Sequence, residues 1–262
     1  MNLLWLYDLP DPFFGLTVVL SSLAFGIGGL FVTRKWVASL HSPHSQNDIV
    51  SFYFAATGVF YGITLGLLAV GTWATFSDTE SKVQQEAGTL GGLYRDISSY
   101  PEPARAVLQE DLKKYVREVI DVSWPLQSKG IVPNGGALLM DAFQRQLAAF
   151  EPVTEGQKVL HMSAMDTYNR MIEFRRARLQ AVSAGLSGTL WLVVVLGGML
   201  TLAASWFFQT GTFSMHFWMT TILSALMGLE MYLIAAMDHP LRGSISVSPQ
   251  AFELIYRQLM AR

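Results

Sequence analysis

The chain has 262 residues, of which 51% are apolar and 15% are charged, and its formal net charge is -2. This length and apolar content predict one membrane domain with a soluble insertion, and the near-neutral charge without a long basic run argues against nucleic acid as a partner. The absence of cysteine excludes a disulfide or a thiolate metal site.

Residues 1–12 mix tryptophan and tyrosine with two aspartates and are too short to span a bilayer, so we expect them at the membrane interface. They show neither a basic region nor a cleavage site, so we expect no signal peptide. Residues 13–33 form the first predicted span, which ends at Arg34 and Lys35. Small residues in this span would allow close packing of helices, namely Ser22, Gly26 and Gly29.

The polar loop 36–47 carries two histidines, His41 and His44, at a spacing that suits a metal ion. Pro43 lies between them, and neither a cysteine nor a nearby acid completes a ligand set. We therefore expect no metal site and no cofactor.

The stretch from Val50 to Tyr94 is the longest predicted helix of the chain. Its first half, residues 50–76, supplies the ~20 apolar residues that a ~30 Å hydrocarbon core requires. Its second half, residues 77–96, is rich in charge, lacks proline and keeps helix-forming residues. The helix is therefore expected to cross the membrane and to continue in water.

This second span has three different faces. One edge carries Gly58, Gly62 and Gly66, which we expect to pack against another helix. A neighbouring strip carries hydroxyl groups, from Thr57, Tyr61, Thr64, Thr72 and Thr75. The remaining side is apolar, with Val59, Phe60, Ile63, Leu67 and Val70. The hydroxyl strip has two interpretations: a packed interface whose hydroxyls bond to their own backbone, which the sequence alone favours, or a wet path across the membrane.

Residues 77–186 are predicted to form a helical domain without strands. Apolar residues recur with a helical period over 103–122, 137–150 and 157–180, and Trp124-Pro125 is expected to end the first of these helices. The third helix ends in a basic group made of Arg170, Arg175, Arg176 and Arg178.

The third span is predicted at 186–208 and the fourth at 215–237. The expected fold is therefore all-α, an integral membrane protein with four transmembrane helices and a helical insertion between spans 2 and 3. The expected divisions are 1–76, 77–186, 187–243 and a tail, 244–262, with a short amphipathic helix. Basic residues near span ends are more numerous on the side of the insertion, which places the insertion and both termini in the cytoplasm.

Glu230 is the one carboxylate deep inside a predicted span. Such residues usually face protein or water, and two interpretations stay open: a protonated or hydrogen-bonded structural glutamate, or an ion site or proton acceptor. Asp238 and Arg242 lie four residues apart at the membrane edge and are expected to form an ion pair where the helix ends.

Glu86 lies beyond the second span, close to the direction in which Tyr61 and Thr64 point. If the hydroxyl strip lines a pore, Glu86 forms a charged ring below it in an oligomer. The simpler interpretation is a solvated face with salt bridges to the basic helix that precedes the third span.

Several short runs together resemble the signature of the bacterial bestrophin-like proteins, the DUF4239 family. They are Gly58, Tyr61, Trp73, Asp78, Glu86-Ala87, Leu90 and Leu93-Tyr94-Arg95, then Trp124-Pro125, and then Asp238-x-Pro240-Leu241-Arg242-Gly243, Val247-Ser248-Pro249 and Phe252-Glu253. The resemblance covers about residues 47–253 and implies a four-span protein of the bacterial inner membrane, distantly related to pentameric bestrophin anion channels. The acidic calcium clasp of true bestrophins has no counterpart run, so calcium gating is not expected.

The leading hypothesis is a homo-oligomeric ion channel whose second span lines the pore through Thr57, Tyr61 and Thr64, with membrane lipids and inorganic ions as its partners. The acids Glu230 and Glu86 favour cations, whereas the resemblance suggests anions. Two alternatives remain: a membrane-anchored scaffold whose helical domain binds a partner, and a proton-coupled transporter that uses Glu230. No catalytic motif is present, so we expect no enzyme.

Overall fold

The computed structural model describes residue 7 and residues 9–39, 47–243 and 245–261, and this part of the chain is helical without a strand. His41 and His44 lie outside the described residues. The helices are α1 (Asp11–Ser39), α2 (Asn47–Ile97), α3 (Ala104–Glu118), α4 (Trp124–Gln127), α5 (Gly135–Ala148), α6 (Glu155–Ala181), α7 (Gly188–Ser205), α8 (Phe213–Asp238) and α9 (Gln250–Ile255), with π-helical turns at Val119–Ser123 and Tyr256–Met260. The predicted all-α class is confirmed.

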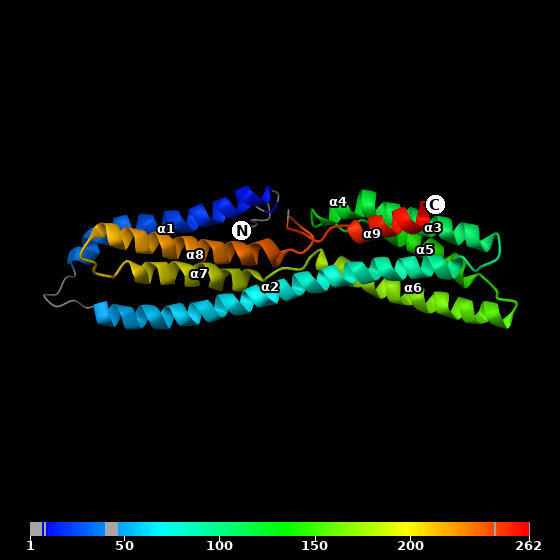
Figure 1. Cartoon of the computed structure of the whole chain (residues 1–262), viewed down its shortest axis with the longest axis horizontal. Coiled ribbons are helices and arrows are strands. Elements are labelled where there is room, and N and C mark those ends of the chain that lie inside the picture. The colour runs from blue at the N-terminus through cyan, green and yellow to red at the C-terminus, as the bar shows by residue number, and fades with distance from the viewer. Residues whose placement is uncertain (1–6, 8, 40–46, 244, 262) are drawn as a thin grey trace. The chain divides into compact units, whose positions relative to one another are not determined.

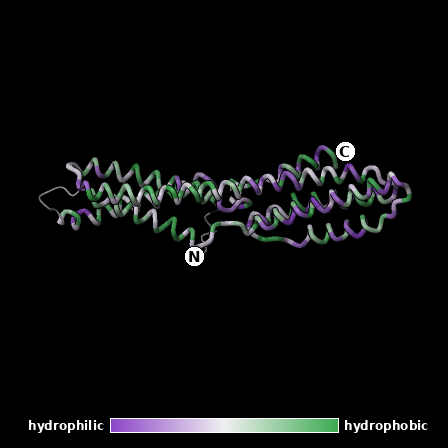
Figure 2. The backbone as a smooth tube through the Cα atoms, turned by 90° about the horizontal axis from the view of Figure 1, so that it is seen from below, coloured by the Kyte–Doolittle hydropathy of each residue, from purple (hydrophilic) through white to green (hydrophobic). Residues whose placement is uncertain are grey.

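Four of these helices, α1, α2, α7 and α8, are long and apolar enough to cross a membrane. The chain divides into two compact units, a membrane unit (Met1–Ala74 with Gly185–Asp238) and an insertion unit (Thr75–Ala184 with His239–Arg262). Apolar residues dominate the helices of the membrane unit, whereas polar and apolar residues alternate in the insertion unit (Figure 2). The sequence places its divisions after residues 76, 186 and 243, near those of the structure, but it treats the C-terminal tail as separate from the insertion.

In the membrane unit the helices run side by side in the order α1, α8, α7 and α2 (Figure 1). Small residues bring α1 and α8 close together, because a Cβ atom at Gly228 would lie 2.8 Å from the Cα atom of Val19 and one at Gly26 would overlap the hydroxyl of Ser224. The Ser22 hydroxyl donates to the Ser224 carbonyl oxygen at 2.7 Å. Close backbone approach and an interhelical hydrogen bond are the usual means of helix association in lipid.

Replacing Gly228 by alanine is expected to destabilise the membrane unit by about 1–3 kcal/mol, because the added methyl group meets backbone atoms of α1 that cannot rotate away. The melting temperature in detergent measures the effect. Gly28→Ala is the matched control, since nothing lies within 4 Å of a Cβ atom at that glycine of α1. Equal melting temperatures for the two variants would contradict the close approach of α1 and α8.

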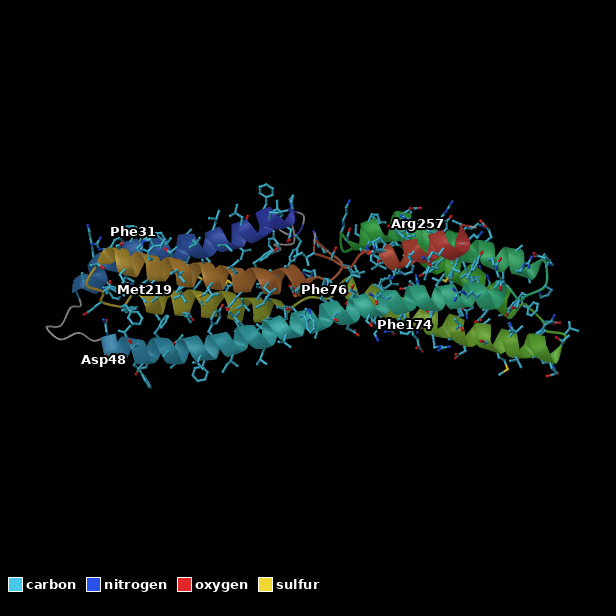
Figure 3. The ribbon with its side chains drawn as sticks, in the orientation of Figure 1. Phe31, Asp48, Phe76, Phe174, Met219 and Arg257 are labelled. Carbon is cyan, nitrogen blue, oxygen red and sulfur yellow. The ribbon has the colours of Figure 1, made fainter. Side chains whose placement is uncertain are left out.

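The end of the membrane unit that holds Arg34 is bound together by short-range contacts. Phe31, Asp48 and Met219 mark this end on α1, α2 and α8 (Figure 3). The Arg34 guanidinium lies 4.3 Å from the ring centroid of Phe213. The Asn47 side-chain amide donates to the Gln209 carbonyl oxygen at 2.7 Å and accepts from the Gln209 amide at 2.9 Å. The start of α2 is thereby fixed to the link between α7 and α8.

The insertion unit has its own apolar core, built on residues 75–97 of α2 together with α3, α5 and α6. Fully buried side chains fill it, including Leu90, Leu93, Leu112, Phe143 and Leu147. The tail contributes Phe252 and Met260 to the same core, so α9 and the turn after it belong to this unit. A capping box at Thr154 and Gln157 begins α6.

The prediction that Trp124-Pro125 ends a helix is wrong. The chain continues from α3 through the π-helical turn Val119–Ser123 into α4, which runs to Gln127. Pro125 lies in the first turn of α4, where a missing amide hydrogen and a fixed φ are tolerated. The π-helical turn shifts the backbone hydrogen bonds from the i→i+4 to the i→i+5 pattern just before the proline. This shift lets the helix continue through Pro125.

Candidate functional site

Tyr61 lies inside the membrane unit and does not face outward. Its side chain is only 7% exposed, and its hydroxyl donates to the Val194 carbonyl oxygen of α7 at 2.8 Å. The ring fits because Gly197 and Gly198 face it: a Cβ atom at Gly197 would lie 2.6 Å from the ring. This placement differs from the expected pore-lining role of Tyr61, since α7 of the same chain covers the side chain.

The other hydroxyls of the strip bond to their own helix. Thr57 donates to the Tyr53 carbonyl oxygen at 2.8 Å, and Thr64 donates to the Phe60 carbonyl oxygen at 2.9 Å. Both threonines are half-buried. Because residues three and four positions apart share a helix face, they lie beside Tyr61 on the side of α2 that turns toward α7. The hydroxyl groups therefore have partners without water.

The opposite side of α2 in the membrane unit is uncovered. No atom lies within 4 Å of a Cβ atom placed at Gly58, Gly62 or Gly66. Large apolar side chains beside them are exposed, namely Val59, Phe60, Ile63, Leu67 and Val70. Only 11% of the most apolar window of α2 is buried, compared with 39% for α8, so α2 is the least covered of the four spans.

Glu230 is exposed on α8 in the single chain. Exposed leucines flank it on the helix, at positions 226, 229 and 233. The carboxylate interacts electrostatically with Tyr61, but it has no hydrogen bond or ion pair within the described part of the chain. An uncompensated carboxylate inside a span is the feature of this unit that most calls for a functional explanation.

Asp238, the last residue of α8, is buried and holds the start of α7. Its carboxylate accepts from the Leu186 amide at 2.5 Å, from the Trp191 indole nitrogen at 2.9 Å and from the Tyr7 hydroxyl at 3.5 Å. A carboxylate beside the first turn of a helix is favourable, because that end of the helix carries a partial positive charge. Arg242 belongs to the insertion unit, so its expected ion pair with Asp238 stays a prediction.

Glu86 and Arg178 form a buried ion pair in the insertion unit. Their side chains are 0% and 1% exposed, and the Arg178 Nε lies 2.7 Å from the Glu86 Oε2. The Arg178 Nη2 donates to the Glu86 Oε1 at 3.0 Å, and the Arg178 Nη1 donates to the Gln127 Oε1 at 2.6 Å. The Tyr115 hydroxyl donates to the Glu86 Oε1 at 2.8 Å. The guanidinium thus has charged and neutral acceptors on two sides.

This geometry corrects the expectation for Glu86. The side chain has no exposed surface from which to form a ring around a pore, because Arg178 and Tyr115 occupy its oxygens. Its partner does come from the basic helix before the third span, but the pair is buried and not solvated. The rings of Trp124 and Phe252 flank the guanidinium, each with its centroid 5.6 Å from the Arg178 Cζ.

Burial and ionic neighbours shift the pKa values of this cluster. Burial raises the pKa of Tyr115 above its usual range, and the negative charge of Glu86 raises it further. Burial by itself lowers the pKa of Arg178, but the charge and hydrogen bonds of Glu86 outweigh it and raise that pKa. Arg178 is therefore charged and Tyr115 protonated at neutral pH. Burial, followed by the charge of Asp96, likewise raises the pKa of Tyr100 to about 12.

The tyrosine pKa values predict that the insertion unit loses stability in alkali. An unfolded tyrosine releases its proton near pH 10, whereas folded Tyr115 keeps it, so unfolding releases a proton and is favoured as the pH rises above 10. The stabilising contribution is complete below pH 10 and falls above it. Melting temperatures between pH 9 and 11 should fall less steeply for Tyr115→Phe than for the wild type.

The described residues contain no group of three or more His, Asp or Glu side chains that could hold a metal ion. The candidate functional features of the membrane unit are instead the uncovered side of α2 and the exposed carboxyl of Glu230. The sequence does not predict that the Glu86–Arg178 pair is surrounded by Tyr115, Trp124 and Gln127. The Trp124-Pro125 run within the family resemblance is the one signal in the sequence that marks this neighbourhood.

The fold and these features define a helical membrane protein with four spans. The family model described as "Bestrophin-like domain" matches residues 20–252, which is most of the chain. The chain therefore belongs to the bestrophin-like family. No protein with a curated function is similar enough in sequence to match.

Solved structures of bacterial bestrophin homologues share the fold. A Klebsiella pneumoniae homologue with a leucine-to-threonine mutation superposes with a TM-score of 0.72 at 11% identity, covering 94% of this chain and 98% of that chain. A structure of the Klebsiella pneumoniae homologue solved by zinc phasing gives a TM-score of 0.70 at 11% identity, covering 94% and 97% of the two chains. At such identities the similarity establishes the fold alone.

Proposed function

We propose that the chain assembles into a homo-oligomeric ion channel of the bacterial inner membrane, with the membrane half of α2 in the wall of the pore. The observation that carries this proposal is the uncovered side of α2, where Gly58, Gly62 and Gly66 have no neighbour within 4 Å. Small residues at this spacing allow close approach of a second helix. Membership of the bestrophin-like family supports the same function.

The residues that line the proposed pore are those on the side of α2 that the rest of the chain leaves exposed. Tyr61 faces α7 and is not proposed as a lining residue. Thr57 and Thr64 are half-buried beside it and stay candidates at the edge of the lining. The free side presents the apolar side chains of Val59, Ile63 and Val70. An apolar constriction of this kind controls conduction by losing and regaining water.

The deciding experiment is a planar bilayer recording of the purified protein in chloride salts of sodium and potassium, with its mass measured in detergent. We expect discrete channel currents and a mass of several chains. Ile63→Thr should raise the conductance if this side chain meets the pore, because a hydroxyl there retains water. A silent protein that is monomeric by mass would refute the channel.

A scaffold function is the second candidate, favoured by apolar side chains exposed on the insertion unit. They are Val107, Leu138, Val153, Val159 and Met162. If the spans serve only as an anchor, a polar side chain at Ile63 has no effect on function, whereas charged residues on this surface abolish partner binding. Currents that respond to Ile63→Thr would argue against the scaffold.

The orientation is proposed from the positive-inside rule, with the insertion unit and both termini in the cytoplasm. Because the chain has no cysteine, single introduced thiols report their side of the membrane. In intact spheroplasts, a membrane-impermeant maleimide should label Gly211→Cys, in the exposed link between α7 and α8, and should spare Val132→Cys, exposed in the insertion unit. The reverse pattern would invert the topology.

A further inference from the structure

Glu230 lies too deep in the membrane unit to reach the lipid headgroups. It is eight residues before Asp238, the end of α8, which is about 12 Å along a helix axis. The hydrocarbon core is about 30 Å thick, so this level is well inside it. A glutamate side chain has only two methylene groups and cannot span that depth.

The residues that the structure describes supply no hydrogen-bond donor to this carboxyl. The nearest residues on the same helix face are Leu226, Met227, Leu233 and Ile234, none of which carries a donor. The Tyr61 hydroxyl, with which Glu230 interacts electrostatically, donates its hydrogen bond to the Val194 carbonyl oxygen. The exposed carboxyl therefore needs a proton, a cation or water from outside the single chain.

Apart from Tyr61 and Tyr232, the charged and titratable groups of the membrane unit lie away from this level. Among the described residues α7 has none, and residues 50–74 of α2 have only Tyr53 and Tyr61. Those of α1 and α8 are near the helix ends or turned elsewhere: Asp11, Arg34 and Lys35 on α1, and His216, Tyr232 and Asp238 on α8. Tyr232 is bound to Asp11, at the N-terminal end of α1, by a 2.7 Å hydrogen bond. Within the described part of the membrane unit, no cation lies near enough to neutralise Glu230.

We propose that the Glu230 carboxylate is a binding site for a small monovalent metal cation, such as sodium or potassium, on a surface of the membrane unit that meets water in the assembled protein. A lipid-facing carboxylate is costly and a sealed one needs a partner, so water access with an exchangeable cation fits this exposed position. The proposal deepens the proposed function, because it rests on an assembly that encloses water, and it names the ligand class of one membrane site.

The first test measures binding without conduction. Dicyclohexylcarbodiimide enters lipid and adds to a protonated carboxyl, and mass spectrometry of the peptide that contains Glu230 reports the added mass. In proteoliposomes at one fixed pH with choline as the only cation, we expect labelling of Glu230. Replacing choline by sodium or potassium should slow this labelling at least fivefold, because a metal cation bound to the carboxylate competes with the proton that the reagent requires.

The result that overturns the proposal is a Glu230 that is never labelled, or one labelled at the same rate in choline, sodium and potassium. Glu230→Gln is the control for the assignment, since it removes the reactive carboxyl and should abolish the added mass. The assembled protein is used throughout, because a neighbouring chain that seals Glu230 would also protect it.

The second test uses reversal potentials in a sodium chloride gradient. Glu230→Gln should lower the ratio of cation to anion permeability at least threefold, and Glu80→Gln, at an exposed acid of the insertion unit, should leave it unchanged. Labelling that sodium or potassium slows in a protein without currents would refute the channel and retain the site. Currents in a protein whose Glu230 is not labelled would refute the site and retain the channel.

Discussion

Replacing Arg178 by methionine is expected to destabilise the insertion unit by about 3–5 kcal/mol. The change leaves the Glu86 carboxylate at 0% exposure without its cation, and the Gln127 side chain loses its 2.6 Å hydrogen bond. When a buried charge loses its partner, its desolvation free energy is no longer offset by an ionic interaction. Denaturant unfolding followed by the change in tryptophan fluorescence measures the loss, because Trp124 is buried in the insertion unit.

Two further variants separate the ion pair from a general effect of arginine removal. Arg170 lies on the same helix and forms an exposed pair with Asp166 at 2.9 Å, so Arg170→Met should cost less than about 1 kcal/mol. The double variant Glu86→Leu with Arg178→Met should recover much of the stability lost by Arg178→Met, because no charge stays buried. If all three variants unfolded alike, the buried pair would not be the source of stability.

The sequence predicts the helices well because their signals are local. Apolar length identifies all four spans, and the absence of proline between Val50 and Asp96 is enough to extend the second span into one long helix. The wrong prediction of a helix end at Pro125 also has a local cause. Periodicity does not show a π-helical turn, and that turn is what lets the helical path continue past Pro125.

The site is harder to predict because it depends on which residues of distant segments meet. A helical wheel groups Thr57, Tyr61 and Thr64 correctly on one face, but it cannot show that Gly197 and Gly198 receive the tyrosine ring. Glu86 is treated as solvated because acidic residues are rarely buried without a partner. Its partner, Arg178, is 92 residues away in the chain, beyond the reach of any periodic pattern.

The positions of Thr57, Tyr61 and Thr64 show which side of α2 packs within the chain and which sides remain exposed. The hydroxyl strip of α2 serves packing within the chain, so the glycine edge and the apolar side remain for contacts outside it. Glu230 adds a polar group to the exposed surface of α8. A membrane unit in which α2 exposes closely spaced glycines and α8 exposes a carboxyl fits an assembly of chains around water better than a single chain immersed in lipid.

Replacing Gly62 by leucine is therefore expected to prevent assembly while leaving the single chain folded. No atom of the chain lies within 4 Å of a Cβ atom at this position, so the new side chain has room in the isolated chain. Between chains the glycine edge permits close approach, and a leucine would hold the helices apart. We expect at least a tenfold weaker association, equivalent to about 1.4 kcal/mol per contact, and the loss of currents.

Gly28→Leu is the matched control, because Gly28 is also an exposed glycine within a span and has nothing within 4 Å of a Cβ atom. It lies on α1, outside the glycine edge of α2, so its variant should keep the oligomer mass and the currents. Native mass spectrometry in detergent measures the mass, and the melting temperature confirms that each variant is folded. An unchanged oligomer with Gly62→Leu would show that the glycine edge of α2 does not join the chains, and the pore would then have to be built on another face of the membrane unit.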